Sequence, residues 1–202
     1  MVYISPKLLL AVHALALAPS VQAANFTLTG SYTNTNQPAS TTGRCAPSAR
    51  TVNIGPSFGS VSGGSNLGIF TPTASHCINP PLPAPYTNGL FSFDFGADDL
   101  LTGSYDGALT ASSNPTVFTN LQNYLITGGT GRFLNAAGSF TGTGTVTFAP
   151  NQLPFSTQVL SGNFSAGAVP EAATWIMMLL GFGAVGSSIR WRRIKTPLTR
   201  LV

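Results

Sequence analysis

Charged side chains are scarce in this sequence. Only 7% of its 202 residues are Asp, Glu, Lys or Arg, whereas it contains 22 glycines and 15 prolines. A bundle of amphipathic helices needs charged outer faces, and frequent glycine and proline interrupt helices, so this composition argues against an all-helical protein. It favours turn-rich β structure, and the length allows one domain with a single core.

The few basic residues are concentrated at the two ends of the chain. Lys7 lies near the start and five of the nine basic residues lie between positions 190 and 200, which leaves residues 24–168 with three arginines and four aspartates. The formal net charge of +4 therefore does not describe this middle region. A protein that binds DNA or RNA needs a basic surface to neutralise phosphates, so we expect no nucleic-acid partner.

The amino terminus has the layout of a secretory signal peptide. Lys7 precedes an apolar run over residues 8–18, and small residues flank the bond between Ala23 and Ala24. We predict a signal peptide over residues 1–23, cleaved after Ala23, with the Sec machinery and signal peptidase as partners. The alternative is an uncleaved anchor, but a helix that crosses a bilayer needs about 20 apolar residues, and this run is shorter.

The carboxyl terminus predicts one transmembrane helix and a basic tail. Residues 172–189 carry no charge, and as a helix they would rise roughly 27 Å, close to the thickness of the hydrocarbon core of a bilayer. Trp175 lies near one end of this segment. The tail, residues 190–202, opens with a cluster of arginines: Arg190, Arg192 and Arg193. The positive-inside tendency would keep the tail in the cytoplasm and place the middle region outside the inner membrane. The alternative, a buried helix, gives no reason for basic residues at one end only.

A short motif containing a proline and a glutamate, residues 169–175, precedes the predicted helix. Its distinctive positions are Val169, Pro170, Glu171, Ala172 and Trp175. With the helix and the basic tail, residues 169–202 resemble the PEP-CTERM sorting signal, although Ala172 replaces the usual second proline. The resemblance implies transient anchoring in the inner membrane of a Gram-negative bacterium and processing by an exosortase. It also implies a final location at the cell surface or outside the cell, associated with exopolysaccharide or biofilm.

Alternating patterns between the two signals predict an all-β domain over residues 24–168. In residues 140–148, Phe, Gly and Val occupy one face and four threonines occupy the other. Residues 91–95 repeat the pattern with three phenylalanines, and residues 96–99 look like a turn. Further strands are predicted at residues 26–33, 51–54, 100–110, 116–127 and 157–166. Short strands at this spacing indicate one β-barrel or one β-sandwich.

A glycine-rich segment predicts a tight hairpin between two of these strands. Its residues are Gly128, Gly129, Thr130, Gly131, Arg132 and Phe133. Followed by Ala136 and Gly138, the segment is similar to the eight-stranded barrels of the dirigent and allene oxide cyclase type. That resemblance implies a barrel able to hold apolar ligands, but it carries over no catalytic residue. The alternative is a phosphate-binding loop, but no Gly-Lys-Ser/Thr follows, and a strand comes next instead of a helix.

The two cysteines, Cys45 and Cys77, predict one disulfide, because both lie in the exported region. The bond would close a span rich in Gly, Ser and Pro that we expect to lack a strong core, and it would contribute ~3 kcal/mol. The alternative is a metal site made by Cys45, His76 and Cys77, but these residues lack the usual Cys-x-x-Cys spacing. The four aspartates are expected to serve in turns and at strand ends, with calcium binding as the alternative.

The middle region offers few groups for catalysis. His76 is its one histidine, no Gly-x-Ser-x-Gly elbow marks a partner serine, and the one glutamate belongs to the sorting motif. We therefore predict a non-enzymatic protein without a cofactor or a metal.

Two other functions stay open. The first is a barrel that binds or isomerises a small apolar ligand, which an internal pocket lined with polar groups would favour. The second is a carbohydrate-binding module, which needs exposed aromatic platforms. The candidates for such platforms are Tyr32, Tyr86, Tyr105 and Tyr124.

Overall fold

The computed structural model describes residues 23–167 and 178–186. The first of these two parts consists of strands with one short 3-10 helix. In chain order its elements are β1 (Ala24–Thr35), β2 (Arg50–Ile54), β3 (Val61–Ser65), β4 (Gly68–Ile78), β5 (Pro85–Asp94), β6 (Leu100–Ala111), β7 (Val117–Gly129), η1 (Gly131–Phe133), β8 (Ala137–Thr147) and β9 (Phe155–Ala166). This part of the chain is all-β, as the sequence predicts.

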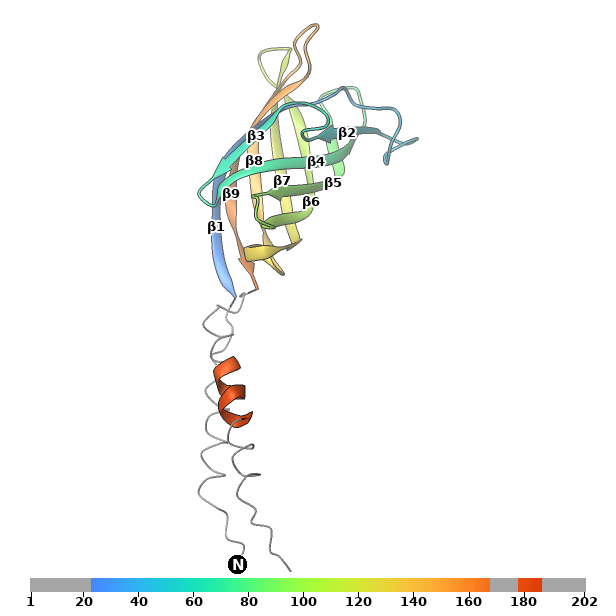
Figure 1. The fold of residues 1–202 in the computed structure, drawn as a ribbon. Coiled ribbons are helices and arrows are strands. Elements are labelled where there is room, and N and C mark those ends of the chain that lie inside the picture. The colour runs from blue at the N-terminus through green and yellow to red at the C-terminus, as the bar shows by residue number, and fades with distance from the viewer. Residues whose placement is uncertain (1–22, 168–177, 187–202) are drawn as a thin grey trace, which may run out of the picture. The chain divides into compact units, whose positions relative to one another are not determined.

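The strands form one antiparallel sheet that closes on itself. Their order is β2-β4-β3-β1-β9-β8-β7-β6-β5, and β4 also pairs with β5 (Figure 1). One edge of β4 is shared, because residues 68–70 pair with β3 and residues 74–78 pair with β2. The domain is therefore a barrel in which β2 and β3 together occupy one strand position, and a two-sheet sandwich does not describe it.

The inward and outward faces follow the predicted alternation. On β8, Phe140, Gly142 and Val146 face the interior, whereas Thr141 and Thr143 are exposed. Because successive side chains of a strand point to opposite faces, each strand lines the barrel with every second residue. The same strand can therefore carry a core row and a polar outer row.

The span between the two cysteines is more ordered than the sequence predicts. It contains β2, β3 and most of β4, and Val52, Ile54 and Phe70 from these strands lie in the core. β3 has a weak strand pattern, but Gly63 lets the Phe70 ring approach, since a Cβ at Gly63 would lie 2.6 Å from that ring. The expectation of a span without a strong core is wrong, because pairing with β1 and β4 defines these strands, and strand preference depends on such neighbours.

Aromatic rings fill one part of the barrel interior. Phe26, Phe133 and Phe164 pack with centroids 5.1 to 5.8 Å apart, and the rings of Tyr124 and Phe140 stack at 4.3 Å. We call this part the packed half; it contains Phe26, Leu28, Phe91, Phe93, Tyr124, Ile126, Phe133, Phe140, Leu160 and Phe164. Its buried apolar surface supplies the main stabilisation of the fold.

The chain enters and leaves the barrel at the same end. Ala24 at the start of β1 pairs with Ala166 at the end of β9 (Figure 1). The predicted signal cleavage after Ala23 therefore falls directly before β1. The connections that follow β1 and precede β9 lie at the other end of these strands.

The second described part is a helix over residues 178–186, inside the predicted transmembrane segment 172–189. Several predictions fall outside the described residues: the signal peptide up to residue 22, the rest of the transmembrane segment, and the sorting positions Val169, Pro170, Glu171, Ala172, Trp175, Arg190, Arg192 and Arg193. Within residues 23–167 and 178–186, none of the helices combines the length and apolar character needed to cross a membrane.

Candidate ligand-binding cavity

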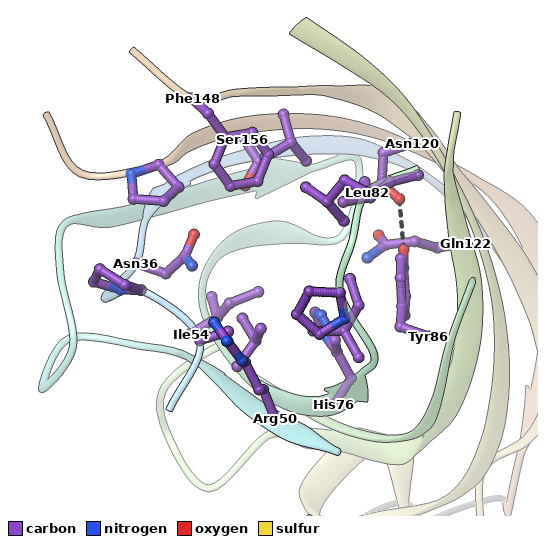
Figure 2. Close-up of a pocket in the computed structure, with 18 of the residues that line it drawn as sticks. Asn36, Arg50, Ile54, His76, Leu82, Tyr86, Asn120, Gln122, Phe148 and Ser156 are labelled. Carbon is purple, nitrogen blue, oxygen red and sulfur yellow. Dashed lines mark hydrogen bonds between the residues drawn. The ribbon is translucent and has the colours of Figure 1, made fainter. Parts of the chain in front are cut away.

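A cavity of about 390 Å³ lies in the barrel end where β1 finishes and β9 begins. Strand residues line it together with three connecting segments, residues 36–39, 80–82 and 148–154. Figure 2 shows side chains from several strands turned toward this space, among them Ile54, His76 and Gln122. Cavities of roughly 300 to 1,000 Å³ have the size that small organic ligands occupy.

The walls of the cavity are mainly apolar, and polar groups gather between it and the packed half. The apolar lining consists chiefly of Val52, Ile54, Ile78, Leu82, Leu109, Val146 and Phe148. Along the strands, two of these polar residues each come one inward position before a residue of the packed half. Gln122 precedes Tyr124 on β7, and Gln158 precedes Leu160 on β9. We call the polar floor the set Tyr32, His76, Tyr86, Asn120, Gln122 and Gln158.

Tyrosine hydroxyls connect the polar floor to the packed half. The Tyr124 hydroxyl donates to Oε1 of Gln122 at 2.6 Å, and the Tyr32 hydroxyl lies 3.0 Å from that of Tyr124 and 3.3 Å from Oε1 of Gln122. Burial raises the pKa of Tyr32 to about 12, although its hydrogen bonds to Tyr124 and Gln122 act in the opposite direction. Burial also raises the pKa of Tyr124 well above its ordinary value. Both phenols therefore stay protonated at neutral pH.

His76 is held between two tyrosines. Its Nδ1 and the Tyr105 hydroxyl share a hydrogen bond of 2.7 Å, and its ring stacks on Tyr86 with centroids 4.3 Å apart. Burial lowers the pKa of His76 to about 3, with a smaller contribution from the charge of Arg44. The imidazole is neutral at physiological pH, so His76 supplies a hydrogen-bonding surface and no charge. The sequence identified His76 as the one histidine of the domain but did not reveal this burial.

The Tyr86 hydroxyl is held by Asn120, another residue of the polar floor. It donates to Oδ1 of Asn120 at 2.5 Å, the bond drawn in Figure 2. Gly107 makes this position possible, because a Cβ there would lie 2.4 Å from the Tyr86 hydroxyl oxygen. Burial raises the pKa of Tyr86 far above its usual range. Tyr86 therefore presents a neutral ring and a hydroxyl whose proton is already donated.

Gln158 differs from its polar neighbours. Its Nε2 and Oε1 atoms are both buried and have no hydrogen-bond partner among the described residues. By contrast, the nearby Asn34 is paired on both sides, since its Oδ1 accepts from Ser156 at 2.9 Å and its Nδ2 donates to Asn36 at 3.3 Å. Leaving a buried amide unpaired costs free energy, so Gln158 is a ready contact for a polar group inside the cavity.

The predicted disulfide joins Cys45 and Cys77 close to this end of the barrel. Arg44 adds to the link, because its Nε donates to Oγ of Ser75 at 3.0 Å and its Nη2 donates to the Ser75 carbonyl at 2.8 Å. These bonds attach the segment after β1 to β4, whose side chains line the cavity. The alternative metal site at Cys45, His76 and Cys77 is wrong, because the disulfide uses both thiols.

The aspartates take part in turns and strand pairs. Asp94 accepts a hydrogen bond from the Gly96 amide at 2.8 Å, and Asp106 accepts one from Asn123 at 3.2 Å. Among the described residues, no three His, Cys, Asp or Glu side chains lie close enough together to hold a metal ion. The turn and strand roles that the sequence predicts therefore account for these carboxylates.

The glycine-rich hairpin lies at the opposite end of the barrel from the cavity. β7 and β8 pair through it, with η1 in the connection, as the sequence predicts. Gly131 has φ of 57°, and a Cβ there would lie 2.2 Å from Oδ1 of Asp99. Asp99 in turn accepts from the Arg132 amide at 2.9 Å and lies 3.0 Å from Nε of Arg132. Asp99 therefore holds this turn, which we call the clamped turn. The alternative of a phosphate-binding loop before a helix does not describe it.

The four candidate tyrosine platforms are not on the surface. Tyr32, Tyr86, Tyr105 and Tyr124 are all buried inside the barrel. These four candidates for the alternative of a carbohydrate-binding module therefore do not form exposed platforms, because they lie on the inward-facing side of their strands.

The interior amides Asn120, Gln122 and Gln158 are site residues that none of the sequence motifs predicted. Asn120 and Gln122 share the phase of Tyr124 and Ile126 on β7, and Gln158 shares the phase of Leu160 on β9. A polar residue in the apolar phase of a strand is the signal that could have identified them.

The carboxyl-terminal residues match a known sorting signal. Residues 168–193 match the family model of the PEP-CTERM protein-sorting motif. The chain therefore carries a PEP-CTERM sorting motif, as the resemblance predicts. The motif makes it an exosortase-targeted surface protein that is exported and anchored in the membrane before processing. No curated protein and no solved structure matches the chain, so the resemblance of the barrel to the dirigent type stays a prediction.

Proposed function

We propose that the β domain of this exosortase-targeted protein binds a small, uncharged and mainly apolar molecule. The observation that carries the proposal is the cavity of about 390 Å³, with its apolar walls and polar floor. A barrel built only for stability would fill this space with side chains, as its packed half does. A few polar groups at the base of an apolar cavity are typical of ligand sites, where they fix orientation.

We also propose that the domain binds its ligand without catalysing a reaction. An acid–base catalyst works best with a pKa near the ambient pH. The titratable groups of the polar floor are far from that range, since burial lowers the pKa of His76 to about 3 and raises that of Tyr32 to about 12. The polar floor therefore offers hydrogen bonds and shape, and no group suited to proton transfer at neutral pH.

The topology of the barrel supports a tethered binding module. The chain leaves β9 at Ala166, shortly before the sorting motif, whereas the cavity lies at the barrel end where β9 begins. The described chain therefore leaves the barrel at the end opposite the ligand site.

The steps of export are part of the proposal. A signal peptidase would release the chain after Ala23, and an exosortase would then remove the helix and basic tail from the membrane-anchored protein of a Gram-negative bacterium. Mass spectrometry of the intact protein in culture supernatant and membrane fractions tests this. A mature protein that lacks residues 175–202 is expected, and an exported protein that retains them would reject processing.

Association with exopolysaccharide or biofilm is a further proposal, and its support is the sorting motif. The outer face of β8 offers an uncharged row of hydroxyls, including those of Thr141 and Thr143, that suits contact with sugars. Co-sedimentation of the exported protein with purified matrix polysaccharide is the expected result. Absence of the protein from the polysaccharide pellet would remove this part of the proposal.

Naphthalene, an uncharged fluorescent hydrocarbon, tests the ligand site. We expect saturable binding to the exported protein, purified without detergent. Val146→Trp should abolish this binding, because Val146 lines the cavity and the larger ring would occupy it. The control is Val159→Trp, at a position that is 60% exposed on the same barrel. Equal binding by the two variants would show that naphthalene does not use the cavity.

A further inference from the structure

The amide of Gln158 has no partner in a region where the other buried polar side chains do. Gln158 is only 1% exposed and lines the cavity, and neither Nε2 nor Oε1 makes a hydrogen bond to the described residues. Its position on β9 pairs with Tyr32 on β1, but the Tyr32 hydroxyl is directed to Tyr124 and Gln122. A molecule bound in the cavity therefore meets a Gln158 amide that is free to pair with it.

The acceptor oxygens of the two neighbouring amides are already used by tyrosine hydroxyls. Oε1 of Gln122 already accepts from two tyrosine hydroxyls, and Oδ1 of Asn120 accepts from Tyr86. The bonds from Tyr86 and Tyr124 are short, at 2.5 and 2.6 Å, and the contact from Tyr32 is longer, at 3.3 Å. Among the described residues, Gln158 is the one whose side-chain amide has both polar atoms fully buried without a hydrogen-bond partner.

The charge around the cavity restricts what that molecule can present. Arg50 is the one permanently charged residue among the described residues that line the cavity, and it is exposed at the rim. His76 is neutral, so no buried counter-charge faces the Gln158 amide. An ionised group brought to this depth would lose its hydration without gaining a partner of opposite charge. The cavity therefore favours an uncharged polar group at its floor.

We propose that Gln158 is the specificity-determining residue of the cavity and that the ligand is an amide carried on an apolar body. This inference rests on the proposed ligand-binding function. A carboxamide has a donor beside an acceptor, so it can pair with Nε2 and Oε1 of Gln158 at the same time. The apolar body of the ligand then lies against Val146, Leu109 and Ile54, toward the mouth of the cavity.

Calorimetry with matched small molecules tests the inference on the exported protein, purified without detergent. The probes are octanamide and methyl heptyl ketone, which differ only by a methyl group in place of the amide nitrogen, together with nonane and octanoate. We expect octanamide to bind at least roughly tenfold more tightly than the ketone, because the ketone leaves one Gln158 atom unpaired. Octanoate should bind more weakly than octanamide.

Two variants test whether the preference for octanamide depends on Gln158. Gln158→Leu should bind octanamide and the ketone with equal affinity, because it removes the amide and keeps the volume. Gln37→Leu makes the same change at an exposed position outside the cavity lining, and it should keep the preference for the amide. Thermal melts of both variants verify that they are folded.

The outcomes separate this inference from the proposed function. Tight binding of nonane and the ketone, with no preference for octanamide, would overturn the role of Gln158 and leave the apolar ligand site intact; a buried water is then the partner of the amide. Tighter binding of octanoate would overturn the inference in favour of a carboxylate at Arg50. Failure of all four probes to bind, together with failure of naphthalene, would refute the proposed function itself.

Discussion

The two parts of the barrel interior come from the same strands but are filled differently. On β7, Ile126 and Tyr124 enter the packed half, whereas Gln122 and Asn120 border the cavity. β9 repeats the division, with Phe164 and Leu160 in the packed half and Gln158 beside the cavity. One continuous alternation therefore serves both parts, and the residue type at each inward position decides whether that level is packed or hollow.

Glycines on the inner face explain how the packed half closes. A Cβ at Gly103 would lie 2.7 Å from the ring of Phe91. Such positions let one ring extend across the interior in place of two smaller side chains. We propose that the packed half stabilises the fold, whereas the cavity half, the end of the barrel whose residues line the cavity, binds the ligand.

The largest effect is expected from removing a leucine in the packed half. Leu28→Ala should lower the free energy of unfolding by about 4 kcal/mol, because Leu28 is fully buried and its loss leaves a void. Leu109→Ala makes the same change in the cavity wall and should cost about 2 kcal/mol, because that side chain already borders open space. Urea unfolding measures both. Equal costs would mean that the two parts of the interior are equally packed.

The second largest effect is expected from removing the disulfide, and this change should act mainly on the cavity half. Replacing Cys45 and Cys77 together by serine opens a loop with a sequence separation of 32 residues and should cost roughly 3 kcal/mol. Naphthalene binding should weaken too, because the segment after β1 lines the cavity and is attached through Cys45 to β4. The control is the parent protein under reducing conditions, which should reproduce the double variant. Unchanged binding in both would separate the disulfide from the site.

Acid should destabilise the protein through His76 in the cavity half. The folded state holds its pKa at about 3, against 6.5 in the unfolded chain. Below pH 6.5 the unfolded chain therefore binds a proton that the folded protein does not, and stability falls as the pH decreases toward 3. Unfolding at pH 5 should require about 2 kcal/mol less than at pH 8.

Two variants test whether this pH dependence of stability comes from His76. His76→Gln should remove most of the difference between pH 5 and pH 8, since glutamine does not titrate. Leu28→Ala, in the packed half, should keep the full difference while lowering stability at both values. A His76→Gln protein that retains the parent pH dependence would assign the effect to other groups.

The smallest effect is expected at the clamped turn beyond the packed half. Asp99→Asn should cost about 1 kcal/mol, because it removes the charge opposite Arg132 at a partly exposed site. High salt should shrink the difference from the parent protein. Asp106→Asn, at an exposed carboxylate that contacts Asn123, is the control and should change stability by less than about 0.5 kcal/mol. Naphthalene binding should be unaffected in both, and a loss of binding in Asp99→Asn would contradict the division between the two halves.

The strands with strong local patterns were predictable and the others were not. β8 and β9 follow a clear alternation, and both appear close to their predicted bounds. β3 reads Val-Ser-Gly-Gly-Ser, and it becomes a strand because β1 and β4 provide hydrogen-bonding edges on both sides. Local preference is weak there, so only the neighbouring strands define it.

The cavity was less predictable than the fold. The inward phase of Asn120, Gln122 and Gln158 can be read from the alternation of their strands, but their partners come from other strands. Tyr86, for example, meets Asn120 across 34 residues of sequence. Which amide is paired and which is left without a partner depends on distances that no local pattern contains.

By itself, the sequence determined the all-β class, the carboxyl-terminal sorting motif and the pairing of two cysteines, because each depends on composition or on residues close together in the chain. Only the tertiary structure decided that the sheet closes through β4 and β5, that four tyrosines are buried, and that Gln158 faces a cavity without a partner. The physical reason is that closure and hydrogen-bond pairing depend on strands far apart in sequence, whose register fixes what each inward side chain meets.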